Sequence, residues 1–347
     1  METQRTYRLK AALWFVFLFT GAMVLATWLV QPALARFQAT LLPDAGAAWY
    51  YWKLPRPELW AGVSMWALYL MHQITVWWLI VKLKNAPRPA AGNIGKYNVW
   101  LLAANAAFIA LHLLQTALFY DALAQFMPVW SSQGSVIVML VMMLILLNSR
   151  RGLFFGKRVS LPPLGVSMTQ KVHGFYISWA VVYTFWFHPM EGTLGHLLGF
   201  LYLFLLLGQL SLARTGWHTK IGWLTLLEAF VALHGAVVAI LAKNGMWPMF
   251  FFGFMMMFVV TQVYGILKNR IAIAGITASY AALVLVTYSG ALGNLFTGTP
   301  VGWTDLHQIT WIPVILYGLV FALSWLLAGA GALIRRRTKK PAPENNV

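Results

Sequence analysis

Long apolar runs separated by short polar segments repeat along the whole chain. Ten of these runs approach the roughly 20 residues that an α-helix needs to cross a lipid bilayer. The fourth run is short, and only a few residues separate the fifth from the sixth. The pattern predicts an all-α, polytopic transmembrane helix bundle with about ten spans. The expected spans are 11–31, 59–81, 98–119, 134–149, 172–189, 193–212, 221–242, 247–267, 271–290 and 309–334.

The connections between the runs are short, and none exceeds about 26 residues. We divide the chain into a four-span part, 1–150, and a six-span part, 151–347, that carries most of the histidines. Neither part leaves room for a soluble cofactor domain. An ALA tripeptide at 33–35 resembles a signal-peptidase site. The apolar run before it, roughly 20 residues, is longer than a signal core of about 7–15, so we expect it to be a retained first span.

Composition agrees with a membrane protein. Hydrophobic residues make up 60% of the 347-residue chain and charged residues only 10%, whereas soluble domains carry roughly 25% charged residues. The chain has no cysteine. This absence excludes disulfides, cysteine-ligated iron–sulfur clusters and haem attached through a C-x-x-C-H motif.

The net charge of +17 is distributed unevenly between the two ends of the spans. Basic residues concentrate in cytoplasmic loops of membrane proteins. If the N-terminus is cytoplasmic, all but four of the 25 Lys and Arg residues fall in cytoplasmic segments. We therefore expect both termini in the cytoplasm of a bacterial cell with the spans in its inner membrane, and membrane lipid instead of nucleic acid as the partner. The four exceptions are Arg36, Lys53, Arg56 and Lys243.

Histidines dominate the polar residues of the apolar runs, where polar groups are costly and often functional. No H-x-x-H, H-E-x-x-H or G-x-S-x-G string occurs. A membrane di-iron hydroxylase, an intramembrane zinc protease and a serine hydrolase are therefore not expected. The histidines are His72, His112, His173, His188, His196, His218, His234 and His307, and Glu228 is the intramembrane carboxylate.

Two of the expected spans, the fifth and the seventh, carry histidines near both ends and run in the same direction. His173 and His218 lie near the inner face, and His188 and His234 nearer the outer face. Fifteen residues of helix rise about 22 Å and sixteen about 24 Å. Such stacked pairs suit two haems, each held by imidazoles from neighbouring helices. A spacing of sixteen turns the helix by about 160°, so His218 must precede its helix to share a face with His234.

This arrangement resembles the di-haem core of membrane cytochromes b, and it is similar to the ferric-reductase-like transmembrane domain shared with NADPH oxidases. The string H-x-x-x-G at His218 and Gly222, followed by His234, is similar to the second haem-binding helix of that domain. The resemblance covers residues 172–242. It implies one or two haem b groups per chain. The implied ligands are His173 and His218 for the inner haem, and His188 and His234 for the outer haem.

Other assignments remain open. His112 and His196 also lie toward the outside, and either could replace a ligand of the outer haem. Each single histidine at a helix end could instead be an interfacial anchor. Glu228 is a candidate catalytic residue, as a proton relay or a hydrogen-bond partner for a quinone, and its structural alternative is a hydrogen bond between helices.

The leading functional hypothesis is a b-type cytochrome subunit of a membrane oxidoreductase. It would pass electrons across the membrane or to and from quinone, with other subunits or a soluble electron-transfer protein as partners. One alternative is a haem-free membrane anchor or quinone-site subunit of a redox complex. A second is a small-molecule or lipid transporter, which the lack of a repeat and of broken, paired spans disfavours.

Overall fold

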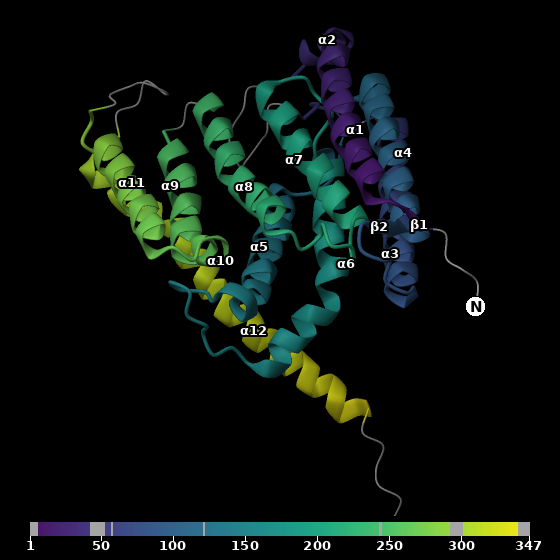
Figure 1. Cartoon of the computed structure of the whole chain (residues 1–347). Helices are drawn as coiled ribbons and strands as arrows, with labels where there is room; N and C mark the ends of the chain where they lie inside the picture. The colour runs from purple at the N-terminus through teal and green to yellow at the C-terminus, as the bar shows by residue number, and fades with distance from the viewer. Residues whose placement is uncertain are drawn as a thin grey trace, which may run out of the picture.

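The fold is a bundle of long helices, seen in a computed structural model that describes residues 6–41, 53–56, 58–120, 122–242, 245–291 and 301–338 (Figure 1). Within these ranges, nine helical segments are long and apolar enough to cross a membrane. The chain is therefore a plausible multi-pass membrane protein. The nine segments are Leu9–Gln38, Leu59–Asn85, Lys96–Phe119, Val129–Arg151, Leu194–Ser211, Ile221–Leu241, Trp247–Ile266, Arg270–Tyr288 and Trp303–Arg335.

Of the ten expected spans, the fifth is the one that is not among these nine segments. It forms α6 (Pro163–Phe187), a helix of 25 residues. Pro163 occupies the first turn, where its missing N–H costs no hydrogen bond. The helix thus starts nine positions before the predicted residue 172. Hydropathy marks only the apolar part of a helix, whereas a proline can mark its first turn.

The N-terminal part pairs three long helices with a small ribbon. Thr6 of β1 lies opposite Gly95 of β2 in an antiparallel pair, which fastens the start of α1 to the start of α4. Residues 42–52 are outside the described residues. The elements are β1 (Thr6–Arg8), α1 (Leu9–Val30), η1 (Gln31–Leu34), α2 (Ala35–Gln38), α3 (Leu59–Asn85), β2 (Asn93–Gly95) and α4 (Lys96–Phe119).

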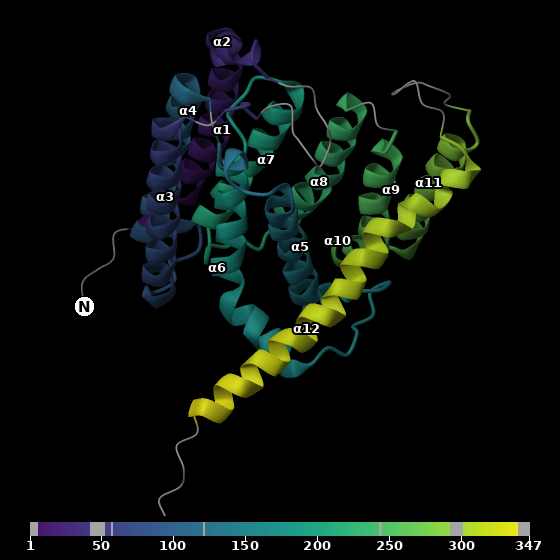
Figure 2. The same ribbon diagram turned by 180° about the vertical axis from the view of Figure 1, so that it is seen from behind.

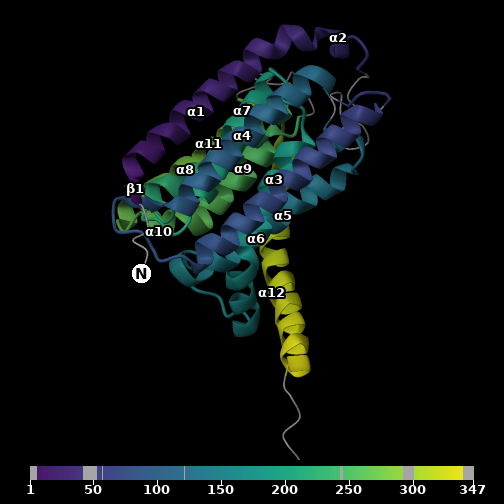
Figure 3. The ribbon, with the colours of Figure 1, turned by 90° about the vertical axis from the view of Figure 1, so that its right-hand side faces the viewer.

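Helix α6 is the centre of the bundle, because it contacts α3, α5, α7 and α12. Its C-terminal half is buried, with Phe185, Trp186 and Phe187 all at 0% exposure. Helices α7 and α8 continue from it as neighbours (Figure 3). The elements of this section are η2 (Leu123–Gln125), α5 (Val129–Arg151), α6, α7 (Leu194–Ser211) and α8 (Ile221–Leu241).

The C-terminal part is more irregular. Its first membrane segment changes from α-helix to a π-helix over Phe258–Gln262. Helix α12 crosses obliquely over α5, α6 and α9, and its C-terminal end projects beyond the other helices (Figure 2). The elements are α9 (Trp247–Met257), the π-helix η3 (Phe258–Gln262), α10 (Val263–Ile266), α11 (Arg270–Tyr288), η4 (Trp303–Thr310) and α12 (Trp311–Thr338).

Large apolar side chains cover the outward faces of the helices. Trp14 and Leu18 of α1 are 66% and 67% exposed, and Trp325 and Leu326 of α12 are 67% and 70% exposed. A water-soluble protein rarely exposes apolar patches of this extent. These faces fit contact with lipid.

Candidate functional site

The structure separates the histidines into a buried group between α3, α4 and α6 and a second group around α6, α7 and α8. His72 and His112 form the first group and are 0% exposed. His173, His188, His196, His218 and His234 form the second. His307 stands apart in η4, where its Nδ1 donates to the carbonyl of Thr304 (2.8 Å).

Both ring nitrogens of His72 bind protein neighbours. The indole Nε1–H of Trp186 donates to Nδ1 of His72 (3.1 Å), so Nδ1 carries no proton and Nε2–H must donate to Oδ1 of Asn105 (2.8 Å). Asn105 in turn donates to Oγ of Ser211 (2.9 Å), and Ser211 donates to the carbonyl of Leu207 (2.8 Å). His72 is therefore a neutral imidazole locked in a structural network, with no nitrogen left for a metal.

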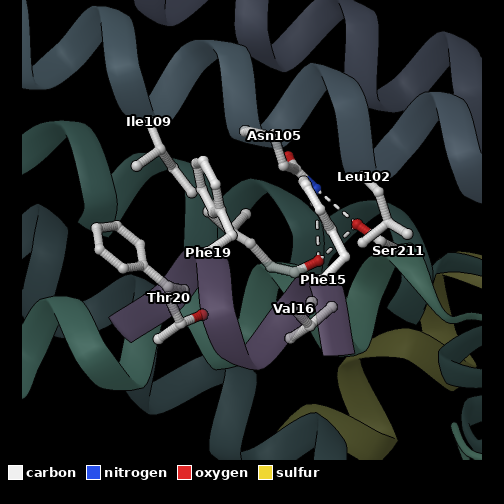
Figure 4. A pocket seen from close by; sticks show the side chains of 12 residues that line it. Phe15, Val16, Phe19, Thr20, Leu102, Asn105, Ile109 and Ser211 are labelled. Atoms are coloured by element: carbon white, nitrogen blue, oxygen red, sulfur yellow. Dashed lines mark hydrogen bonds between the residues drawn. The ribbon is translucent and has the colours of Figure 1, made fainter. Parts of the chain in front are cut away.

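This network borders a small pocket between α1, α4 and α7, into which Asn105 and Ser211 point from facing helices (Figure 4). Phe15, Phe19 and Ile109 form much of its apolar wall. Its volume of about 20 Å³ suffices for one water molecule and not for a cofactor.

His112 belongs to the same buried group. Its Nε2 donates to the backbone carbonyl of His188 (2.9 Å), and its ring packs on Trp186 with centroids 4.3 Å apart. This contact fixes the loop that follows α6. The protein thus uses Nε2 of His112, and only Nδ1 remains for the alternative of His112 as an outer ligand.

At the basic end of the bundle, His173 and His218 have the same local geometry. In His173, Nδ1 donates to the carbonyl of Gln170 (2.8 Å), and in His218, Nδ1 donates to the carbonyl of Gln209 (3.0 Å). A carbonyl only accepts, so Nδ1 carries the proton in both rings and Nε2 is the basic nitrogen. No hydrogen bond to either Nε2 is made by the described part of the chain.

His218 lies before α8, which begins at Ile221. The spacing of sixteen residues to His234 therefore imposes no helical rotation on it. Its position is set by Gln209, whose Nε2 donates to the carbonyl of His218 (2.9 Å). Burial lowers the pKa of His218, which favours the neutral imidazole that a metal requires. Electrostatic interactions reach from His218 to His173 and Arg150.

At the opposite end, His188, His196 and His234 gather around the start of α7. The Nδ1 of His188 donates to the carbonyl of Thr184 (3.0 Å), and the His188 and His196 ring centroids are 6.0 Å apart. Electrostatic interactions link His234 to both other rings. The Cε1 edge of the His234 ring faces Gly199 of α7, where an added Cβ would be 3.1 Å from Cε1.

A carboxylate that the sequence reading overlooked stands beside this outer group. Glu191 is 1% exposed, and its Oε1 accepts a hydrogen bond from Nε2 of Gln38 (2.9 Å). Its Oε2 lies 3.5 Å from Nδ1 of His196, which also contacts Oγ1 of Thr193 (2.8 Å). Glu191 and Thr193 thereby hold His196 at Nδ1. The sequence signal was a lone acid in the short α6–α7 loop, between two apolar runs.

Glu228 is not the lone carboxylate that the sequence suggests. Its Oε2 lies 3.0 Å from Nη1 of Arg151, with both side chains largely buried. Arg151 was expected in a cytoplasmic loop, but α5 extends two residues further and carries it into the bundle. Gly265 of α10 makes room for the arginine, because a Cβ there would collide with the Arg151 side chain. The structural alternative, a polar link between helices, thus describes the observed role of Glu228.

Direct metal binding needs more ligands than these groups offer. Among the described residues, no cluster of three or more His, Cys, Asp or Glu side chains could hold a metal ion. Haem needs only two protein ligands, because the porphyrin supplies the other four nitrogens. Rings fixed through Nδ1 with Nε2 available, as in His173 and His218, fit such axial ligation.

The chain has no recognisable relative among known proteins in three comparisons. No protein-family model, no curated protein and no solved structure matches it.

Proposed function

We propose that the chain is an integral-membrane b-type cytochrome, a subunit that carries single electrons within a membrane oxidoreductase. The observation that carries this proposal is the orientation of the paired histidines. In His173, His218 and His188, Nδ1 donates to a backbone carbonyl, and a contact of this kind orients metal-ligating imidazoles. His72, by contrast, has both nitrogens engaged.

In this proposal His173 and His218 hold the inner haem, and His188 and His234 hold the outer one. When bound, haem supplies a one-electron redox centre inside the low-dielectric bilayer. In His173, His218 and His188, backbone carbonyls hold Nδ1 and so orient the ring. Fifteen residues separate His173 from His188, which corresponds to about 22 Å along the helix axis.

The test is a dithionite-reduced minus oxidised spectrum of the purified protein, with haem quantified as the pyridine complex. We expect sharp reduced bands and about two haems per chain. A featureless spectrum from folded protein would overturn the proposal, and the haem-free anchor would then replace it.

Two variants decide the outer ligand. The proposed pairing of His188 with His234 predicts that His234→Ala loses the outer haem and that His196→Ala keeps it, whereas the contacts of His196 Nδ1 with Glu191 and Thr193 would also suit a ligand. The reverse result would assign the ligand to His196 and contradict the pairing of His188 with His234.

A further inference from the structure

An aromatic groove lies on the surface between α3 and α6. Trp77 of α3 faces Val172, Phe175, Tyr176 and Trp179 of α6, and together they line a volume of about 320 Å³. The four α6 residues follow the i, i+3, i+4, i+7 spacing of one helical face. The volume is within the range of small-molecule sites.

The polar atoms of the groove walls are already hydrogen-bonded within the protein. Nε1 of Trp77 donates to the carbonyl of Phe175 (3.1 Å), and Nε1 of Trp179 donates to the hydroxyl of Tyr69 (3.1 Å). Tyr176 donates to the carbonyl of Ser135 (3.3 Å). These bonds fix the rings, so the groove offers rigid aromatic faces and edges to an occupant. Such surfaces favour a flat conjugated ring.

A cation marks the basic end of the groove. Nζ of Lys84, in the last turn of α3, lies 4.1 Å from the centroid of the Phe175 ring. It donates to the carbonyl of Lys171 (3.2 Å), which uses one of its three N–H groups. The remaining donors suit a carbonyl or an anionic oxygen at the edge of a ring. A lipid acyl chain has neither the flat ring nor the oxygen that these features complement.

We propose that this groove binds the headgroup of a membrane quinone, with its ring among Trp77, Phe175 and Trp179 and one carbonyl oxygen at Lys84. Val172 of the groove immediately precedes His173, and Lys84 interacts electrostatically with that histidine. The groove is thus next to the proposed inner haem ligand. The inference rests on the proposed function for the redox role of the quinone, but binding itself needs no haem.

The test is equilibrium binding of radiolabelled decylubiquinone to the full chain in phosphatidylcholine nanodiscs. We expect saturable binding to about one site per chain, weakened about tenfold by Trp77→Leu or Lys84→Gln, the size expected from one lost aromatic or charged contact. Trp78→Leu and Lys82→Gln are matched controls. Trp78 stacks on Trp100 outside the groove, and Lys82 lies over Trp78, so both should bind quinone normally.

Equal effects in the two sets of variants, or non-saturable partitioning, would overturn the groove assignment. Displacement of the quinone by added phosphatidylglycerol would identify an anionic lipid site instead and would also overturn it. Haem content measured on the same samples separates the two proposals. Quinone binding by haem-free protein supports the groove and contradicts the cytochrome, and haem without quinone binding does the opposite.

Discussion

The buried histidines between α3 and α4 and the histidines around α6–α8 are the same residue type in opposite situations. His72 is held by Trp186 and Asn105, which fix its tautomer and use both nitrogens. In His173 and His218 only Nδ1 is held, by backbone carbonyls, and Nε2 keeps no hydrogen bond within the described residues. Burial alone therefore does not identify a ligand. What distinguishes His72 from His173 and His218 is the number of ring nitrogens that the protein uses.

The largest expected effect tests this comparison directly. His218→Ala should remove about one haem per chain, because an axial nitrogen is lost, whereas His72→Ala should keep the full complement. Haem content by the pyridine assay checks both variants. Haem loss from His72→Ala in protein that remains folded would contradict the separation of the two groups.

The buried ion pair gives the next largest effect. Glu228→Gln should destabilise the protein by about 3–5 kcal/mol, because Arg151 keeps its charge in a buried position without a counter-ion. Denaturation in mixed micelles measures the change. The double variant Arg151→Met, Glu228→Met should recover most of the loss. If it were as unstable as the single variant, shape and not charge would be the cause.

A smaller loss of stability is expected on the buried-histidine side. His72→Phe should cost about 1–3 kcal/mol, because Nε1 of Trp186 and Oδ1 of Asn105 lose their partner. The same denaturation assay applies. Unchanged stability would show that the network around Ser211 rearranges to satisfy both groups.

The smallest effect sharpens the description of the outer pair. Gly199→Ala should shift the outer haem spectrum while retaining the haem, because the new Cβ would press on the His234 ring at 3.1 Å. Electron paramagnetic resonance of the oxidised protein measures the shift. Gly21→Ala is the control, since nothing lies within 4 Å of its added Cβ. Identical spectra for both variants would mean that His234 does not hold a haem.

The apolar runs of the sequence were enough to predict the helical bundle, and most helix bounds agree within a few residues. The run at 134–149 was placed too short, because the Ser-rich segment before it is polar in sequence. The helix begins at Val129, and Ser131 and Ser135 donate to carbonyls three residues earlier. A hydroxyl satisfied in this way tolerates a helical position inside the membrane.

The candidate site was less predictable, because its features depend on contacts between distant residues. The spacing in the sequence identified the four paired histidines as candidates. Only the fold shows which of their ring nitrogens form hydrogen bonds within the protein. The partnership of Arg151 with Glu228 spans 77 residues. Glu191 was missed because no local pattern shows that Gln38 and His196 surround it.

The π-helix in the membrane segment Trp247–Ile266 has a consequence for the register of the residues that follow it in that segment. Its carbonyl at Val260 accepts a hydrogen bond from Phe155 (2.8 Å), which anchors the α5–α6 loop. One additional residue in a turn advances the angular phase of the helix by about 100°. Gly265 meets Arg151 only at this phase. Removing one residue from Phe258–Gln262 would rotate a larger side chain into the place of Gly265. That side chain would press on Arg151 and disturb its ion pair with Glu228.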